Sequence, residues 1–215
     1  MQELEESLMV TQVEIASVYR SSKEIYEFFK RFTDIILCII ASIIAIPITV
    51  ITCVFVLLES KGNPIYSQER LGKDEKSFII YKIRSMSCDA EKNGPRWADK
   101  NDERVTNIGK FIRKTRIDEL PQLYNILKGD MTIVGPRPER AVFTYEFEKT
   151  IPGFTNRLKV KPGLTGLAQV NGGYEITPKE KLYWDLKYIE EKNFAKDLNI
   201  ILKTVVVVVT GHGAR

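Results

Sequence analysis

The sequence has little histidine and little cysteine. Its single histidine, His212, excludes a zinc site built from several histidines and a relay that needs more than one. The three cysteines, Cys38, Cys53 and Cys88, show no CxxC spacing and form no set of pairs, so no disulfide framework is expected. Cys38 and Cys53 lie in an apolar run, where we interpret them as small hydrophobic residues in a reducing compartment.

Signals of several common function classes are also absent. The sequence contains no GxxxxGK[ST] phosphate loop and no GxGxxG fingerprint, which argues against a P-loop kinase and a Rossmann enzyme. Internal repeats and low-complexity tracts are missing as well. Residues 1–29 show no cleavage-site pattern after a short apolar core, so a signal peptide is not expected.

The charge of the chain is mildly basic and unevenly distributed. Its 215 residues suit one domain of ordinary size or a domain with an appendage, and the formal net charge is +4. This points weakly to anionic partners without choosing between nucleic acid, lipid headgroups and nucleotides. Residues 104–140 contain eight bases and four acids, so this segment alone carries an excess equal to that of the whole chain.

One long hydrophobic run favours insertion into a membrane. Residues 35–58 carry no charge, and as one helix these 24 residues would be about 36 Å long, enough to cross a hydrocarbon core of about 30 Å. Pro47 falls near the middle and leaves halves of about 18 Å each. Four basic residues flank the run on each side, so the positive-inside rule names no outer side. A kinked span and a re-entrant hairpin therefore both stay open.

The remaining patterns predict a mainly α fold with a small β-hairpin, that is, an α+β domain. Two strands at 65–68 and 78–83 flank a polar turn at 72–74, and a short buried strand is expected at 131–134. Helices are expected over 106–114, 139–149 and 177–191, and loops over 86–104 and 161–166. An apolar segment over 194–209 is expected to pack in the core or to lie at a membrane interface.

The adjacent carboxylates Asp118 and Glu119 are the main candidates for chemistry. A helical apolar pattern follows them, Pro121 suits its first turn and Gly129 its end, so Asp118 is expected to be the N-cap. The pair would then lie at the positive end of a helix dipole among arginines, which suits a metal-assisted reaction on a phosphorylated substrate. The alternative is a capped surface helix with solvated charges.

Six further side chains are candidates for substrate binding. Prolines on both sides of Arg137 stiffen its backbone, which favours a phosphate contact by its planar fork over a surface turn. Two bases would leave the second hairpin strand on one face, one base would be delivered by the helix at 106–114, and two amides beside small residues could approach a nucleotide. These are, in that order, Lys82 and Arg84, Arg113, and Gln169 and Asn171.

Four motifs, in this order along the chain, resemble those of a known family. They are Lys82-Ile-Arg-Ser-Met86, Asp118-Glu-Leu-Pro-Gln-Leu123, Gly135-Pro-Arg-Pro138 and Lys161-Pro-Gly-Leu-Thr-Gly-Leu-Ala-Gln-Val-Asn-Gly172. In these stretches, and in Pro47 within the apolar run, the chain resembles the bacterial sugar transferases, the monotopic polyprenyl-phosphate phosphoglycosyl transferases that begin glycan assembly. The resemblance runs from about Lys30 to the C-terminus.

The resemblance implies a two-step exchange. The aspartate of the family's Asp-Glu dyad, here Asp118, attacks the β-phosphate of a UDP-sugar and releases UMP, and a polyprenyl phosphate such as undecaprenyl phosphate then takes the phosphosugar. Glu119 matches the second member of the dyad, as a base or a metal ligand, and Mg²⁺ held by Asp118 and Glu119 is the implied cofactor. The product would initiate synthesis of a surface polysaccharide, such as a capsule or exopolysaccharide, or of another glycoconjugate.

The resemblance also implies a domain organisation. An N-terminal extension (1–29) would precede a re-entrant membrane helix broken near Pro47 (30–60), which joins a compact catalytic domain with interfacial helices (61–215). The chain would lie at the cytoplasmic face of the bacterial inner membrane, in contact with membrane lipids and with no nucleic acid. A homodimer is compatible with this arrangement, and the extra membrane spans of larger relatives are not expected.

One position departs from the family pattern, and two other function classes compete. Many family members have Arg after Val-Asn-Gly, where this chain has Gly173, so one candidate contact to the nucleotide or diphosphate is missing. A membrane-tethered nucleic-acid binder would use the same bases, but it needs interleaved aromatic residues and no carboxylate pair. A structural scaffold at the membrane interface would tolerate Asp118→Asn.

Overall fold

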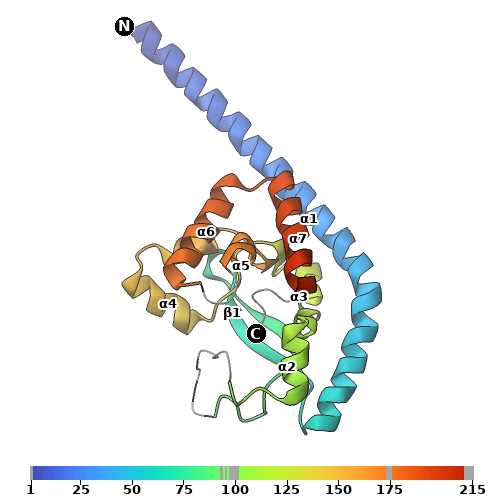
Figure 1. The fold of residues 1–215 in the computed structure, drawn as a ribbon. Coiled ribbons are helices and arrows are strands. Elements are labelled where there is room, and N and C mark those ends of the chain that lie inside the picture. Colours follow the sequence, from blue (N-terminus) through green and yellow to red (C-terminus); the bar gives the residue numbers. More distant parts are fainter. Residues whose placement is uncertain (1, 93, 95, 97–101, 173–175, 211–215) are drawn as a thin grey trace.

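A computed structural model describes the backbone of residues 2–92, 94, 96, 102–172 and 176–210, and side chains from residue 23 onward within these ranges except residue 209 (Figure 1). Gly173, His212 and part of the expected loop at 86–104 lie outside the described residues. The elements in chain order are α1 (Gln2–Glu59), β1 (Ile65–Leu71), η1 (Lys73–Glu75), β2 (Ser77–Ile83), α2 (Asn107–Lys114), η2 (Ile117–Glu119), α3 (Gln122–Lys128), β3 (Thr132–Val134), α4 (Ala141–Thr150), η3 (Phe154–Lys159), β4 (Gly163–Thr165), α5 (Leu167–Gly172), α6 (Pro178–Glu191) and α7 (Phe194–Thr210), where η marks a short 3₁₀ helix.

The described part of the chain is mostly helical with a small antiparallel hairpin, as the sequence predicts. β1 and β2 pair with Ile65 opposite Ile83 and Leu71 opposite Ser77. The inward side chains of β2, Phe78 and Ile80, pack in the core, so the hairpin shows the period of two expected for a half-buried strand. The turn predicted at 72–74 contains the 3₁₀ helix η1.

A second pair of strands was not predicted. The strand expected at 131–134 is β3, and its partner is β4, which lies within the segment expected to be a loop at 161–166. The two strands are parallel, with Thr132 beside Gly163. Their backbones approach so closely that a Cβ built on Gly163 would lie 2.1 Å from the Gly135 nitrogen, which excludes any larger residue there. Strands of three residues are too short to show a period in sequence.

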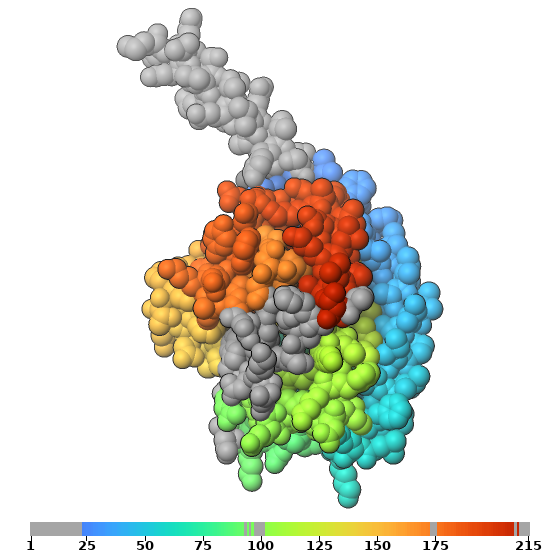
Figure 2. Space-filling view, viewed as in Figure 1, coloured from blue at the N-terminus to red at the C-terminus, as the bar shows by residue number. Residues whose placement is uncertain are grey.

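Helix α1 lies along one side of the domain (Figures 1 and 2). Its buried side chains recur at intervals of four or seven residues, which is one stripe of a helix. They are Tyr26, Lys30, Asp34, Cys38, Ala45, Thr52 and Val56. Between residues 35 and 58 the other faces of α1 are apolar and open, with Ile43 72% and Leu58 77% exposed. This continuous apolar surface has no protein partner among the described residues.

No helix end falls at Pro47, where a break was predicted. α1 runs from Gln2 to Glu59 through Pro47 and curves around the domain. The boundaries predicted between 1–29, 30–60 and 61–215 stay predictions. The hydroxyls of Ser42 and Thr52 bond to carbonyls four residues earlier on either side of the proline, and such back-bonding accompanies helix bending. Re-entrance into a membrane stays a prediction.

Helices α6 and α7 close the domain against β3. The helix predicted over 177–191 is α6, and a capping box opens it, with Thr177 and Glu180 bonded to each other's backbone. Tyr188 of α6 and Ile200 of α7 are buried with Val134 and Leu167 in one cluster. The opposite face of α7 is open and apolar. Its exposed residues include Leu198, Leu202, Val205 and Val206. The segment therefore uses one face for the core and leaves the other free.

Candidate active site

The carboxylate pair lies in a tight turn in front of α3. Asp118 and Glu119 belong to η2, which follows Arg116 in the left-handed region (φ 60°, ψ 15°), and Pro121 takes the N-cap position of α3. The prediction that Asp118 caps this helix is therefore wrong, because the chain makes a 3₁₀ turn first. Gly129 ends α3 with φ 98°, as predicted. A non-glycine residue with positive φ is uncommon, so this turn fixes both carboxylates at a defined place.

The turn forms one wall of a large cleft. The cleft has a volume of ≈ 940 Å³ and is bounded by the hairpin, the loop after β2, α2, the segment after β3 and the start of α6. Its walls carry many cationic side chains. These are Arg70, Lys82, Arg84, Arg96, Arg104, Arg113, Arg116, Arg137, Arg140 and Lys181. The local excess of positive charge seen in the sequence is therefore gathered around one cavity, which suits a ligand with several phosphate charges.

Glu119 is held firmly by two of these cations. Lys82 Nζ donates to Glu119 Oε1 at 3.1 Å, and Arg137 donates to both carboxylate oxygens, at 3.4 Å for Nη1 to Oε2. Burial alone would raise the pKa of Glu119, but the charges of Arg137 and Lys82 outweigh it and hold the pKa well below its usual range. Glu119 is thus a fixed anion whose oxygens are already engaged.

Asp118 is equally buried but far less engaged. Its nearest cation is Lys82, with Nζ 3.9 Å from Oδ2, and within the part of the chain that the structure describes no hydrogen bond reaches its carboxylate. Burial raises its pKa, and the charges of Lys82, Arg137 and Arg113 offset this only in part. Of the two adjacent carboxylates, Asp118 therefore has oxygen lone pairs available to a ligand.

The other predicted site residues divide into two groups. Lys82, Arg113 and Arg137 lie in the same cleft as the carboxylates. Arg113 comes from α2, whose N-cap is Thr106, and the charge of Arg113 acts on Asp118. The guanidinium of Arg137 contacts Glu119, and the phosphate contact predicted for it stays a prediction.

The remaining three predicted residues are committed mainly to the backbone. Arg84 lines the cleft, but its guanidinium bonds to the carbonyls of Ser60 and Lys61, so it ties β2 to the end of α1. Gln169 donates to the Leu164 carbonyl at 3.0 Å, and only its Oε1 is left without a partner. Asn171 donates to the Leu167 carbonyl within α5 and does not line the cleft.

Sequence reasoning missed a second charged layer beneath the pair. Glu139, expected to begin a helix, precedes α4 and is buried against Arg70 and Lys181. Arg157 is 1% exposed, contacts Asp185 at 2.7 Å and donates to the Arg137 carbonyl at 2.8 Å. The only signal in the sequence was the charged Arg-Pro-Glu-Arg run, which drew attention to Arg137. It did not indicate that Glu139 in the same run pairs with Arg70 and Lys181, which are distant in the chain.

A magnesium ion fits this donor set in one way. Among the described residues no group of three or more His, Cys, Asp or Glu side chains could hold a metal. Mg²⁺ commonly uses one or two carboxylates and completes its shell with waters and substrate phosphates. Asp118, whose oxygens are open to the cleft, is the carboxylate that fits this role, and Glu119 lies beside it with its oxygens shared by two cations.

Comparison with known proteins gives a consistent result. The family model for bacterial sugar transferases matches residues 25–211. A UDP-N-acetylgalactosamine-undecaprenyl-phosphate N-acetylgalactosaminephosphotransferase of Aeromonas hydrophila is 43% identical over 194 residues, covering 89% of this chain and 46% of that protein. A UDP-glucose:undecaprenyl-phosphate glucose-1-phosphate transferase of Klebsiella pneumoniae is 41% identical, covering 82% of this chain and 39% of its own length.

A third relative names yet another sugar. An undecaprenyl-phosphate galactose phosphotransferase of Salmonella typhimurium is 36% identical over 222 residues, covering 96% of this chain and 45% of that protein. The chain thus spans less than half the length of these three relatives. Their names share undecaprenyl phosphate and differ in the sugar, so similarity at this level does not choose a donor.

Proposed function

Because the chain belongs to the bacterial sugar transferase family, we propose that it transfers a sugar 1-phosphate from a UDP-sugar to undecaprenyl phosphate and releases UMP. The observation that carries this proposal is the contrast within the carboxylate pair. Asp118 is buried and open to a basic cleft, while the neighbouring Glu119 is bound on both oxygens by Lys82 and Arg137. One carboxylate is thereby available as a nucleophile and the other holds the cations around it.

In the first step a carboxylate oxygen of Asp118 attacks the β-phosphorus of the UDP-sugar. A bond forms between that oxygen and phosphorus, and the bond from the β-phosphorus to the bridging oxygen breaks, so that UMP leaves with the electron pair. In the second step a phosphate oxygen of undecaprenyl phosphate attacks the same phosphorus. The Asp118–phosphorus bond breaks, the carboxylate is restored, and the product is an undecaprenyl-diphosphate sugar.

The cleft residues explain how two anions meet. A carboxylate and a diphosphate repel each other unless nearby cations offset their charge, and Lys82 and Arg113 lie close enough to act on Asp118. Arg137 uses two of its N–H groups on Glu119, and a guanidinium has five, so it keeps donors for a phosphate oxygen. Glu119 orients Lys82 and Arg137 toward the reacting phosphorus.

Magnesium is proposed as the cofactor, held by Asp118 with Glu119 beside it and completed by diphosphate oxygens. When bound, it would neutralise charge that develops on the leaving phosphate. Asp118 is the carboxylate that would hold it, whereas the firm contacts of Glu119 keep its oxygens on Lys82 and Arg137.

We further propose that α1 is embedded in the bacterial inner membrane with the catalytic domain on the cytoplasmic face. Residues Lys23–Glu59 form a helix long and apolar enough to cross a membrane, and only 17% of its most apolar window is buried in the protein. A soluble core helix would be mostly buried. Cysteines introduced at Ser21 and Ser60 should both resist an impermeant thiol reagent in intact cells, and labelling of one alone would mean a true span.

The transfer itself is tested by measuring UMP. The purified full chain with Mg²⁺ and undecaprenyl phosphate should release UMP from at least one of UDP-N-acetylgalactosamine, UDP-glucose and UDP-galactose, the sugars named by the three relatives. The organic phase should gain one sugar diphosphate lipid for each UMP. Release of UDP instead of UMP would indicate a glycosyl transfer and overturn the proposal.

A further inference from the structure

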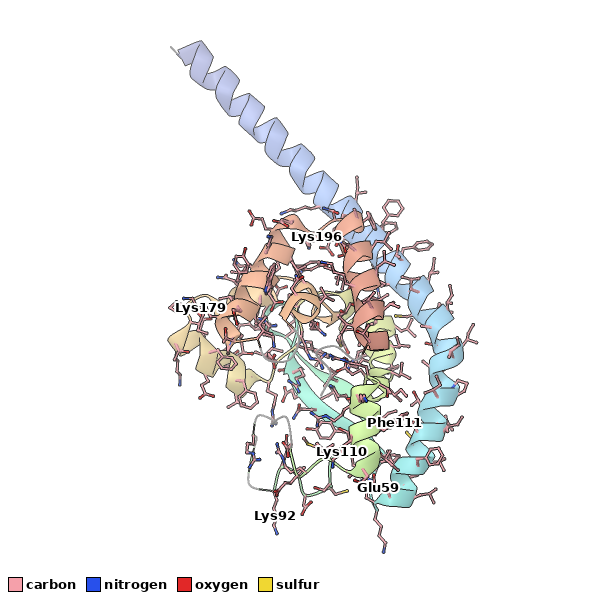
Figure 3. All side chains as sticks on the ribbon, in the orientation of Figure 1. Glu59, Lys92, Lys110, Phe111, Lys179 and Lys196 are labelled. Carbon is pink, nitrogen blue, oxygen red and sulfur yellow. The ribbon has the colours of Figure 1, made fainter. Side chains whose placement is uncertain are left out.

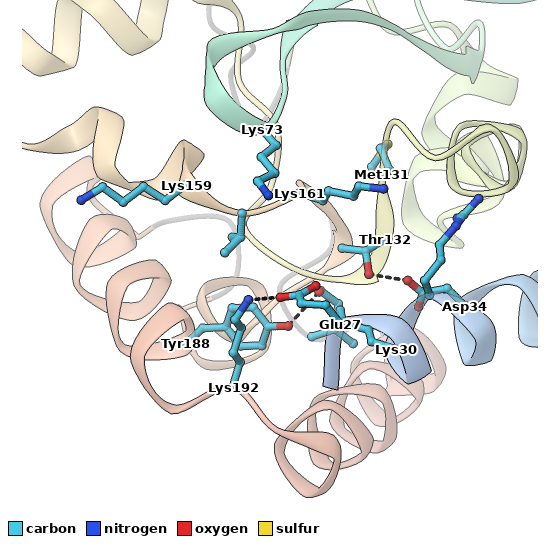
Figure 4. A pocket seen from close by; sticks show the side chains of 13 residues that line it. Glu27, Lys30, Asp34, Lys73, Met131, Thr132, Lys159, Lys161, Tyr188 and Lys192 are labelled. Atoms are coloured by element: carbon cyan, nitrogen blue, oxygen red, sulfur yellow. Dashed lines mark hydrogen bonds and ion pairs between the residues drawn. The ribbon is translucent and has the colours of Figure 1, made fainter. Parts of the chain in front are cut away.

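A second cavity lies on another side of the domain. Its volume is ≈ 300 Å³, and it shares no lining residue with the large cleft. Its walls come from α1, the hairpin turn, the start of β3, the segment before β4 and the end of α6 (Figure 4). Six of its lining residues are cationic and two are acidic. The cations are Lys30, Arg31, Lys73, Lys159, Lys161 and Lys192, and the acids are Glu27 and Asp34.

Half of these cations already have protein partners. Lys30 contacts Asp197 at 2.6 Å, and Lys192 pairs with Glu27. Arg31 donates to the carbonyls of Ile126 and Leu127 at the end of α3. The acid Asp34 is likewise engaged. Its carboxylate accepts from the Thr132 hydroxyl at 2.5 Å and from the Ile133 backbone.

The other three cations have no such partner. Lys73, Lys159 and Lys161 form no ion pair and no side-chain hydrogen bond with any residue that the structure describes. Figure 4 shows Lys73 descending from the hairpin turn toward the segment that carries Lys161, while Lys159 extends to the side. Burial and the nearby charges of Arg31 and Lys73 lower the pKa of Lys161. Like charges gathered at one cavity repel each other, and an anion placed between them would remove that cost.

We propose that this cavity binds the phosphate group of an anionic lipid headgroup, held by Lys73 and Lys161 with Lys159 at the rim. The choice of a lipid follows from the position of α1. The residues of α1 that wall the cavity, Glu27 to Asp34, lead directly into the open apolar run that begins at Ile35. This part of the proposal rests on the membrane placement of α1 proposed above, which would bring the cavity to the depth of the headgroups.

Binding can be measured without membranes and without turnover. The full chain in a neutral detergent is titrated calorimetrically with a short-chain phosphatidylglycerol below its micelle concentration, and separately with inorganic phosphate. We expect the double variant Lys73→Gln/Lys161→Gln to weaken the lipid about tenfold or more, since two charge-assisted contacts are lost. Lys73→Arg/Lys161→Arg keeps the charge and should bind within about twofold of the original.

A matched control removes the same charge elsewhere. Lys110 on α2 and Lys179 on α6 are exposed, point outward in Figure 3 and line neither cavity. The variant Lys110→Gln/Lys179→Gln should bind the lipid as the original does. Equal binding by the Lys73→Gln/Lys161→Gln variant would overturn the site. Inorganic phosphate that binds as tightly as the lipid, with the same dependence on these lysines, would overturn the lipid assignment. Neither result depends on sugar transfer.

Discussion

Asp197 and Asp118 are both 7% exposed, yet the protein holds them in different ways. Asp197 on α7 accepts hydrogen bonds from Tyr26, Lys30 and Tyr188 at 2.6–2.9 Å. Its buried carboxylate therefore has hydrogen-bond donors on both oxygens and a lysine that offsets its charge. No hydrogen bond from the described residues reaches Asp118, whose nearest cation lies 3.9 Å away.

We interpret the difference as that between a structural carboxylate, Asp197, and the proposed nucleophile, Asp118. Burying a charge costs several kcal/mol unless partners compensate it, and Asp197 has three partners that join α1, α6 and α7. Asp118 is compensated only by cations at a distance, and the substrate and metal are the groups that would complete its surroundings. Substitutions at the two positions should therefore affect different properties, and the following predictions test this.

The largest effect is expected at Asp118. Asp118→Asn keeps the size of the side chain and removes the proposed nucleophile, so turnover should fall by about 10³-fold or more. The melting temperature should stay the same or rise, because a buried charge that is only partly compensated is lost. Initial rates of UMP release and a thermal melt measure both. A variant that retains a tenth of the activity would return Asp118 to a supporting role.

Asp197 should show the opposite behaviour. Asp197→Ala leaves Lys30 buried without its partner, which should cost about 3–5 kcal/mol of folding free energy and lower the melting temperature by roughly 6–20 °C. The folded fraction should keep its turnover, because Asp197 does not line the cleft. Glu191→Ala is the matched control. Its ion pair with Lys196 is exposed, and its loss should cost about 1 kcal/mol or less.

A substitution at Arg137 tests whether Glu119 needs a planar guanidinium as its partner. Arg137→Lys keeps the charge but cannot contact both oxygens of Glu119, so kcat/KM should fall by at least about tenfold, equivalent to about 1.4 kcal/mol. Kinetics with one UDP-sugar at fixed lipid concentration give the value. Unchanged kinetics in the lysine variant would leave Arg137 as an ordinary charge on the cleft wall.

The smallest effect concerns pH. Attack requires ionised Asp118, and burial raises its pKa, so activity should fall on acidification above the range of an ordinary aspartate (about 3.9). Arg113 lowers this pKa, so Arg113→Gln should raise it further and move the acid limb of the rate profile to higher pH. Lys110→Gln, on the same helix but exposed, should leave the limb in place. Equal shifts in both variants would remove Arg113 from the site.

Much of the fold and part of the candidate site could be predicted from the sequence, because the signals for these features lie between residues close together in the chain. The hairpin followed from strands around a polar turn, and α2 and α6 from the helices predicted over 106–114 and 177–191. The carboxylate pair and the gathering of bases around it were found because they are close in sequence. Asn171 was predicted as a binding residue because its amide lies beside small residues in the sequence. In the structure its side chain donates to the Leu167 carbonyl within α5.

The rest depends on contacts between residues far apart in the chain. Asp197 lies 171 residues from Tyr26, so nothing near it in sequence marks it as a buried anchor. Asp118 was expected to cap α3 because a helical apolar pattern with Pro121 in its first turn follows it, but the chain makes a 3₁₀ turn after Arg116 and the N-cap is Pro121. α1 passes through Pro47, and residues on both sides of the proline, Cys38 and Val56, are buried against the domain, which the local sequence around Pro47 does not show.

Asp118 is the proposed nucleophile that carries the phosphosugar, and one measurement tests this role directly. The full chain is incubated with UDP-sugar and Mg²⁺ in the absence of undecaprenyl phosphate, and UMP is quantified while the digested protein is analysed by mass spectrometry. We predict a burst of UMP of up to one equivalent and the added mass of a sugar phosphate on the peptide that contains Asp118. UMP that appears only with the lipid acceptor, without a modified peptide, would mean direct transfer and would contradict the account.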